Sequence, residues 1–193
     1  MNIYFDTEFT GLNQDTTLIS IGLVAENGYT FYAELTDYSQ TQCDDWIKTN
    51  VLGNLKLGFL KNNHVIISEK SGHCWEVKGD TKYVGLLLTS WLSSYTDVQL
   101  VSDVCHYDMV LLMGLFRDPL KEKADSFRFT EMTGICPVCH DINQDIARFL
   151  DISEAKAFDI SRESLVKVQI EGEKHNALYD AKVIKYIYEL INE

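Results

Sequence analysis

The first 35 residues show the short apolar runs and turn residues that are typical of β-strands. Runs rich in β-branched and aromatic residues occupy 2–6 (NIYFD), 17–25 (TLISIGLVA) and 29–35 (YTFYAEL). The last two flank Asn27-Gly28, a dipeptide that is strongly favoured in two-residue hairpin turns. The pattern therefore predicts three strands, of which the second and third form a hairpin.

Helical spacing of apolar residues dominates the rest of the chain. We expect helices over 43–55, 81–95, 107–116 and 175–191, a core strand over 98–103, and a strand end followed by a helix over 139–150. Asp44 or Asp45 is the candidate cap of the first helix. HVIIS (64–68) and HCWEV (73–77) have the pattern of a small added hairpin.

This order of elements predicts an α/β fold. Along the chain, three antiparallel strands come first and are followed by the order helix–strand–helix–strand–helix. The strands form one mixed sheet, and the helices cover it. The chain has 193 residues, 46% hydrophobic content and two prolines, with no repeat or long linker. A single domain over 1–193 is therefore expected.

Charge, cysteine content and hydropathy limit the setting and the partners. No run of 18 apolar residues is present, so no membrane span is expected, and acidic residues interrupt the region where a signal peptide would need an apolar core. The odd count of five cysteines favours a reducing, cytoplasmic setting. The net charge of −12 argues against coating nucleic acid by charge alone, but it is compatible with carboxylates that hold metal ions.

Asp6 and Glu8 end the first apolar run and are separated by one residue. In a strand, residues i and i+2 point to the same face, so the two carboxylates converge and would repel each other. A divalent cation such as Mg²⁺ or Mn²⁺ would remove that conflict. The alternative is an exposed edge strand with two solvated acids, which is common for an isolated D-x-E.

The last predicted helix contains a second pair of candidates, His175 and Asp180. Five residues correspond to about 140° around a helix, so the two do not share one continuous helical face. The pair fits a site if His175 precedes the helix, with Asn176 as its cap, and Asp180 lies one turn inside. A surface His and a solvated helical Asp are the alternative.

Between these segments, Asp108 opens a strongly apolar helix in VSDVCHYDMVLL (101–112). An acid in the first turn of a helix can simply interact with the helix dipole. Asp103 and His106 are rival candidates within the same stretch.

Taken together, DTEFTGL (6–12), HYDMVLL (106–112) and HNALYDA (175–181) resemble the motifs of the DEDDh class of 3′-5′ exonucleases. That class has a ribonuclease H-like fold and includes ribonuclease T, oligoribonuclease and the proofreading subunit of bacterial DNA polymerase. The resemblance covers nearly the whole chain. More narrowly, YFDTEF (4–9), LISIGLVAENG (18–28) and WIKTNVL (46–52) resemble small bacterial and phage exoribonucleases of the mycobacterial type.

The resemblance implies that four acids hold two Mg²⁺ or Mn²⁺ ions and that His175 is the general base; the acids are Asp6, Glu8, Asp108 and Asp180. It also implies helices on both faces of the sheet, a homodimer, and a family-specific insertion around 36–80. A sister class has Tyr four residues before its last Asp, where this chain has Asn176, so the His class is indicated.

The second motif departs from the pattern of the class. Many members have Asn about four residues before the acid, where this chain has Val104, with Asp103 beside it. The choice between Asp103 and Asp108 therefore stays open, although the Tyr-Asp pairing favours Asp108.

The residues after the first acids are candidates for binding the terminal nucleotide; they are Phe9, Thr10, Gly11 and Leu12. Phe9 and Leu12 would pack on the last bases, and backbone amides would meet the 3′-hydroxyl. The alternative is that Phe9 and Leu12 are core residues. A substitution of Leu12 by Ala that reduces stability but leaves KM unchanged would favour this alternative.

Two further signals lie outside these motifs. CPVCH (136–140) matches a haem-attachment sequence and contains Cys136 and Cys139, but ordinary free thiols are the favoured interpretation over haem, zinc or redox chemistry. Basic residues in KEKADSFRF (121–129), with Lys167 and Lys174, could contact phosphates or could be solvated loop charges.

The sequence therefore predicts a metal-dependent 3′-5′ exonuclease that acts on the 3′ end of single-stranded or 3′-overhanging nucleic acid. RNA is favoured over DNA, and the product is a nucleoside 5′-monophosphate. A catalytically inactive binding module on the same fold is the alternative from another functional class.

Overall fold

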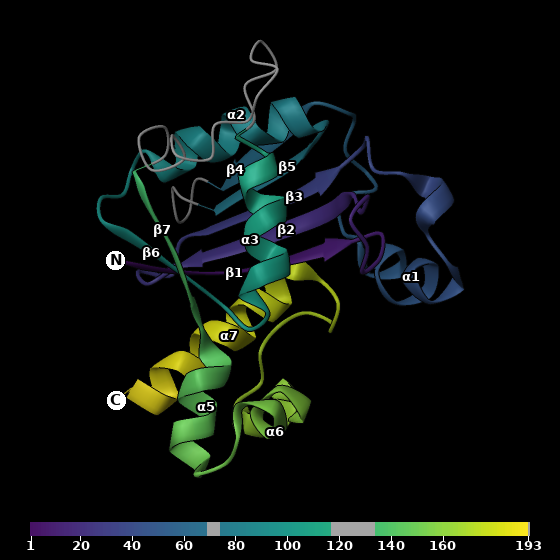
Figure 1. Cartoon of the computed structure of the whole chain (residues 1–193). Helices are drawn as coiled ribbons and strands as arrows, with labels where there is room; N and C mark the ends of the chain where they lie inside the picture. Colours follow the sequence, from purple (N-terminus) through teal and green to yellow (C-terminus); the bar gives the residue numbers. More distant parts are fainter. Residues whose placement is uncertain (69–73, 117–133, 193) are drawn as a thin grey trace.

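A mixed seven-stranded sheet forms the centre of the molecule in the computed structural model, which describes residues 1–68, 74–116 and 134–192. The described strands are β1 (Asn2–Phe9), β2 (Leu18–Ala25), β3 (Thr30–Leu35), β4 (His64–Ser68), β5 (Cys74–Gly79), β6 (Val98–Ser102) and β7 (Ile135–Asp141). Their order across the sheet is β4-β5-β3-β2-β1-β6-β7 (Figure 1).

The predicted arrangement of the early strands is confirmed. β1 pairs antiparallel with β2, and β2 pairs antiparallel with β3 through the Asn27-Gly28 turn. β6 pairs in parallel with the other edge of β1, and β7 pairs in parallel with β6. The small hairpin also forms, because β4 pairs antiparallel with β5, and β5 extends the sheet in parallel beside β3.

Helices cover both faces of the sheet, as predicted. The principal helices are α1 (Asp45–Asn50), α2 (Thr81–Leu92), α3 (Cys105–Gly114), α5 (Ile142–Leu150), α6 (Glu154–Asp159) and α7 (Ala177–Asn192). In Figure 1, α2 and α3 lie on one side of the sheet, and α5 and α7 lie on the other. None of the helices in the described ranges is both long and apolar enough to cross a membrane.

The side chains of β1 alternate between these two layers. Ile3 and Phe5 are buried in the core under α2 and α3, whereas Tyr4 is buried in the core under α7. Since successive side chains of a strand face opposite sides, Asp6 lies on the same face as Tyr4, toward α7. The strand thus brings its acidic end to the α7 side of the sheet.

The predicted helix over 43–55 is shorter than expected. α1 is capped by Asp44, whose carboxylate accepts a hydrogen bond from the backbone N–H of Ile47 at 2.8 Å. The helix ends at Asn50 and a short 3₁₀ helix, η2, follows over Leu52–Asn54. Gly53 lies within that 3₁₀ turn, and glycine is a poor residue for continuing an α-helix.

The predicted strand end and helix over 139–150 are confirmed, because β7 ends at Asp141 and α5 begins at Ile142. CPVCH lies within this strand. α6 was not predicted; Ser153 caps it by accepting a hydrogen bond from the backbone N–H of Lys156 at 3.3 Å. A further 3₁₀ helix, η4 (Arg162–Leu165), connects α6 to the segment that precedes α7.

Candidate functional site

The first turn of α7 lies directly against the sheet at Gly22. Gly22 is the cross-strand partner of Asp6, and a Cβ atom at this position would lie 2.4 Å from the backbone carbonyl of Ala177. The missing side chain therefore allows α7 to approach β2 closely. Asp180, one turn further along α7, is brought to the acidic end of β1 by this contact.

Asp6, Glu8 and Asp180 form the first cluster of acids. One carboxylate oxygen of each residue lies within 4.8 Å of the others, a spacing that could hold a metal ion. β1 contributes two of these acids and α7 contributes the third. The structure therefore brings together the acids of the first and last sequence motifs.

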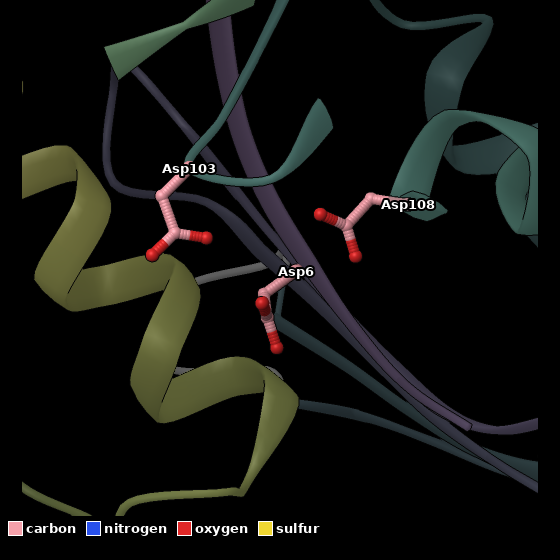
Figure 2. Close-up of side chains that lie close together, drawn as sticks. All are labelled: Asp6, Asp103 and Asp108. Atoms are coloured by element: carbon pink, nitrogen blue, oxygen red, sulfur yellow. The ribbon is translucent and has the colours of Figure 1, made fainter. Parts of the chain in front are cut away.

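A second cluster shares Asp6 with the first. Oxygens of Asp6, Asp103 and Asp108 also lie within 4.8 Å of one another. Figure 2 shows the carboxylates of Asp103 and Asp108 approaching Asp6 from different segments, Asp103 after β6 and Asp108 from α3. Both rival candidates of the second motif are thus near Asp6.

Asp108 is buried and its carboxylate is held by three donors. The backbone N–H and the hydroxyl of Thr7 donate to Oδ1 at 3.1 and 2.6 Å, and the hydroxyl of Ser102 donates to Oδ2 at 2.5 Å. Each carboxylate oxygen has two lone pairs, so these bonds fix the orientation of Asp108 and still leave acceptor capacity. Thr7 and Ser102 therefore support Asp108, although neither is one of the acids or the histidine of the sequence motifs.

Asp103 is held from the opposite side by Arg162 and Asn143. The Nε of Arg162 donates to Asp103 Oδ2 at 3.0 Å, and the side-chain amide of Asn143 donates to the backbone carbonyl of Asp103. Arg162 also donates to the amide oxygen of Asn143 at 2.6 Å. The guanidinium is largely buried, with 13% of its side chain exposed, so it partly compensates the charge of Asp103.

The pKa values of the acids are raised. Burial is the main cause at Asp6, whose pKa lies well above its usual range, and the charge of Asp108 adds to the effect. Burial and the charge of Asp180 raise the pKa of Glu8 to about 8. The pKa of Asp180 rises to about 7, mainly through burial and then through the charge of Asp103.

The pKa values of Asp108 and Asp103 are also raised, but contacts with neighbouring groups limit the rise. Burial raises the pKa of Asp108 to about 7, although the hydrogen bonds from Ser102 and Thr7 lower it. Burial also raises the pKa of Asp103, and the Arg162 guanidinium opposes that shift.

This donor set fits hard divalent cations. All five side chains offer carboxylate oxygens, which are the ligands that Mg²⁺ and Mn²⁺ prefer. Burial first, and then the charges of the neighbouring acids, disfavour the ionised carboxylates, and a bound cation would offset both effects. Neither candidate metal cluster in the described part of the chain contains a cysteine or a histidine.

His175 lies beside the first cluster, immediately before α7. Its Nδ1 is 4.0 Å from Oε1 of Glu8, and one third of the side chain is exposed. Burial, and then the charge of Lys174, lower its pKa below the ordinary value. The imidazole is therefore mostly neutral at physiological pH, which a proton acceptor requires.

A cleft of about 560 Å³ opens over the acids and His175. Phe9, Leu12 and Tyr107 line one part of it, and Phe158 from α6 also borders it. Leu12 is 72% exposed, so it is not a core residue. The ring of Phe9 lies 6.1 Å from that of Tyr107, centroid to centroid.

Thr10 and Gly11 are placed differently from Phe9 and Leu12. Neither is among the residues that line the cleft. Thr10 is buried, and its hydroxyl donates to Oε1 of Gln42 at 2.6 Å. Thr10 therefore stabilises the turn after β1, while Phe9 and Leu12 line the cleft.

The cysteine pair and the basic residues that the sequence also offered as candidates lie in different parts of the molecule. Cys136 and Cys139 both lie on β7, and the side chain of Cys139 packs against the core under α2 and α3. Lys174 borders the cleft and pairs with Glu163 at 3.4 Å. The basic stretch 121–129 lies outside the described residues.

Comparisons with known proteins agree with this arrangement. The model of the 3′-5′ exoribonuclease Rv2179c-like domain matches residues 1–191. The 3′-5′ exoribonuclease Rv2179c of Mycobacterium tuberculosis is 40% identical over 55 residues, which cover 28% of this chain and 33% of that protein. The matched stretch is thus about a third of the length of that relative.

Two solved structures share the fold. S. pombe Pop2p in its Mg²⁺- and Mn²⁺-bound form has a TM-score of 0.59 at 15% identity, covering 99% of this chain and 82% of that one. A 3′-exonuclease in a structure of 3′-end-specific recognition of a histone mRNA stem-loop has a TM-score of 0.60 at 12% identity, covering 98% of this chain and 63% of that one. The ribonuclease H-like fold predicted from the sequence is confirmed.

Proposed function

The chain belongs to the 3′-5′ exoribonuclease Rv2179c-like domain family, and from this premise we propose that it is a metal-dependent 3′-5′ exonuclease. The substrate is the 3′ end of single-stranded or 3′-overhanging RNA, with DNA less favoured, and the product is a nucleoside 5′-monophosphate. The observation that best supports the proposal is that Asp6 belongs to two carboxylate clusters, each spaced to hold a cation.

The acids have distinct roles in this proposal. Asp6 is shared by two cation positions, Glu8 and Asp180 complete one of them, and Asp108 supports the other. When bound, a pair of divalent ions stabilises the charge that develops on both the attacking and the leaving oxygen of a phosphodiester. The hydrogen bonds from Thr7 and Ser102 keep Asp108 oriented toward Asp6.

His175 accepts the proton of the attacking water. Its lowered pKa keeps the imidazole neutral, and its position beside Glu8 is close to the proposed cation site. Partial exposure leaves the proton a route to solvent after the reaction. This combination of acids and histidine is the reason for assigning the protein to the DEDDh class.

The apolar border of the cleft fits bases better than it fits a long phosphate backbone. Phe9, Leu12 and Tyr107 are partly or largely exposed where they border the cleft. Base–aromatic stacking tolerates different bases, which suits an enzyme that removes successive nucleotides. The acidic chain, with its net charge of −12, favours short or single-stranded ends over long duplexes.

Release of labelled nucleoside 5′-monophosphate from a short RNA oligomer tests the proposal. We expect release with Mg²⁺ or Mn²⁺, none with EDTA, and slower release from a DNA oligomer of the same sequence. Asp6→Asn and His175→Ala should nearly abolish release while the fold is retained, as seen by circular dichroism. Equal release with and without EDTA would reject the metal-dependent mechanism.

The alternative is an inactive module that binds RNA or protein on the same fold. It would bind the RNA 3′ end without releasing mononucleotide under any metal condition. The complete set of acids together with His175 favours the enzyme, because a binding module does not need them in one cleft.

The resemblance also leads us to propose a cytoplasmic homodimer whose subunit is one domain, with residues 36–80 as a family-specific insertion. Light scattering of the purified protein tests the dimer, and a single cooperative unfolding transition tests the single domain.

A further inference from the structure

His175 has a backbone conformation that needs support from its surroundings. Its φ is 62°, in the left-handed region that non-glycine residues seldom adopt. Such a conformation persists only where neighbouring contacts fix it, and it is often found at functional positions. The contacts on either side of His175 therefore decide where its imidazole points.

Asn54, at the end of η2, contacts the chain on both sides of His175. Its side-chain amide donates to the backbone carbonyl of Lys174 at 2.7 Å. Its own backbone carbonyl accepts a hydrogen bond from the side-chain amide of Asn176 at 3.0 Å. One residue thus holds both neighbours of the histidine.

Trp46, in the first turn of α1, contacts the imidazole itself. The two ring centroids are 5.0 Å apart and the ring planes are at 73°, which is an edge-to-face arrangement. α1 is anchored because Ile47 and Val51 pack with Ile19 of β2 in a small separate core. The indole therefore limits the movement of the ring on its exposed side.

The same segment is tied to the sheet through Glu34 of β3. Oε1 of Glu34 accepts hydrogen bonds from the backbone N–H groups of Lys56 and Leu57 at 2.6 and 2.9 Å, just after η2. It also accepts from the hydroxyl of Tyr32 at 2.9 Å, and that hydroxyl accepts from Asn176 at 3.0 Å. The buried carboxylate of Glu34 thus links the segment after η2 directly to β3, and it links Asn176 to the same strand through the hydroxyl of Tyr32.

We propose that Trp46 and Asn54, from the stretch 36–80, are positioning residues that hold the His175 imidazole in its reactive orientation. This inference rests on the proposed role of His175 as the general base. Neither residue lines the cleft, so both act through His175 and not through the substrate.

The test measures kcat and KM for a short single-stranded RNA with Mn²⁺ in Trp46→Ala and Asn54→Ala. We expect each change to lower kcat by about tenfold and to leave KM within about twofold, because a misplaced base slows proton transfer without weakening binding. Trp46→Phe should restore most of kcat, since it keeps an aromatic edge. Lys48→Ala, an exposed position on α1 that pairs only with Asp45 among the described residues, should match the wild type.

A double-mutant comparison separates positioning from general damage. In a His175→Ala background under single-turnover conditions, Trp46→Ala and Asn54→Ala should cause no further loss, because their effect passes through the missing imidazole. NMR relaxation of the His175 ring should show greater mobility in Asn54→Ala than in the wild type. An equal loss in both backgrounds, or a rise in KM alone, would overturn the positioning role.

The proposed function can fail separately. A wild-type kcat in His175→Ala would overturn the assignment of the general base. A wild-type kcat in both Trp46→Ala and Asn54→Ala, beside an inactive His175→Ala, would overturn only the positioning role.

Discussion

Asp6 is the residue on which burial and the neighbouring negative charges act together. Burial and the charges of Asp108, Asp180 and Glu8 all raise its pKa. The side chain is therefore unfavourable for the metal-free fold and favourable for the proposed chemistry. Stability and activity should respond in opposite directions when its charge is removed.

Asp6→Asn should reduce mononucleotide release by about a hundredfold or more, because both proposed cation positions lose a ligand. The same change should raise the Tm of the metal-free protein, because it removes a buried charge and its repulsion. Thermal melts in EDTA and the nuclease assay measure the two effects. Asp15→Asn, at an exposed acid, is the matched control, and a lower Tm in Asp6→Asn would contradict the explanation.

Asp103 and Asp108 should differ in their importance. Asp108→Asn should lower kcat by about a hundredfold, whereas Asp103→Asn should lower it by about tenfold or less, because Arg162 already compensates the charge of Asp103. Titration with Mn²⁺, followed by calorimetry, should show weaker binding mainly in Asp108→Asn. The reverse order of effects would make Asp103 the second-motif acid.

Among single residues, the sequence indicates those candidates for the site whose placement depends only on neighbouring positions in the chain. Strand alternation placed Asp6 and Glu8 on one face, and the D-x-E, Y-D and H-x₄-D patterns located the other candidates. Arg162 could not be found in this way, because it meets Asp103 only through the fold of the segment after α6. The exposure of Leu12 likewise depends on a turn whose conformation the apolar pattern does not specify.

Among the elements, the contact between β2 and α7 has the greatest effect on the site. Gly22 allows the first turn of α7 to approach the sheet, and Asp180 follows on that helix. The backbone of Ala177 would lie only 2.4 Å from an added Cβ, so the helix would have to move. The position of Asp180 therefore depends on a glycine in another strand.

Gly22→Ala should destabilise the protein by about 1–3 kcal/mol through overpacking. It should also weaken Mn²⁺ binding by about tenfold or more, because Asp180 moves away from Asp6 and Glu8. Urea unfolding and calorimetric titration measure these quantities. Gly58→Ala is the control, since its Cβ would meet open space, and unchanged Mn²⁺ affinity in Gly22→Ala would argue against this account.

The elements that the sequence predicted best are those with a strong local period. The three early strands, the hairpin of β4 and β5, and helices α2, α5 and α7 all appear where apolar spacing is regular, whereas α3 is indicated only by its high apolar content. α6 has six residues, too few for a clear period, and it was missed. Only the end of β7 was predicted, because the cysteines and proline in CPVCH obscure the strand pattern of its earlier residues.

At the scale of the whole molecule, the raised pKa values make stability depend on pH and on metal. Glu8 has a folded pKa of about 8, and Asp108 and Asp180 have folded pKa values of about 7, all above their unfolded values. The native state therefore binds more protons than the unfolded state between about pH 4 and pH 8. The free energy of unfolding of the metal-free protein should fall as pH rises through this window.

Thermal melts in EDTA at about pH 5 and about pH 8 should show the lower Tm at the higher pH. Mn²⁺ should raise Tm more at the higher pH, because it binds the ionised acids and stabilises the state that it binds. Asp6→Asn should flatten both dependences. A Tm that rises with pH in EDTA would contradict the proposed link between stability and the ionisation of these acids. A rise of Tm with Mn²⁺ that is the same at both pH values would contradict it too.

Asp6 and Asp180 lie side by side in the fold but far apart along the chain. A ribosome that synthesises this protein reads the codon for residue 6 early and must continue to residue 180 before the two side chains can meet. Until then, a nascent copy carries an incomplete set of acids beside the messenger from which it is being translated. Synthesis from the N-terminus would therefore withhold the proposed nuclease activity from nearby RNA until that late helix has emerged and docked.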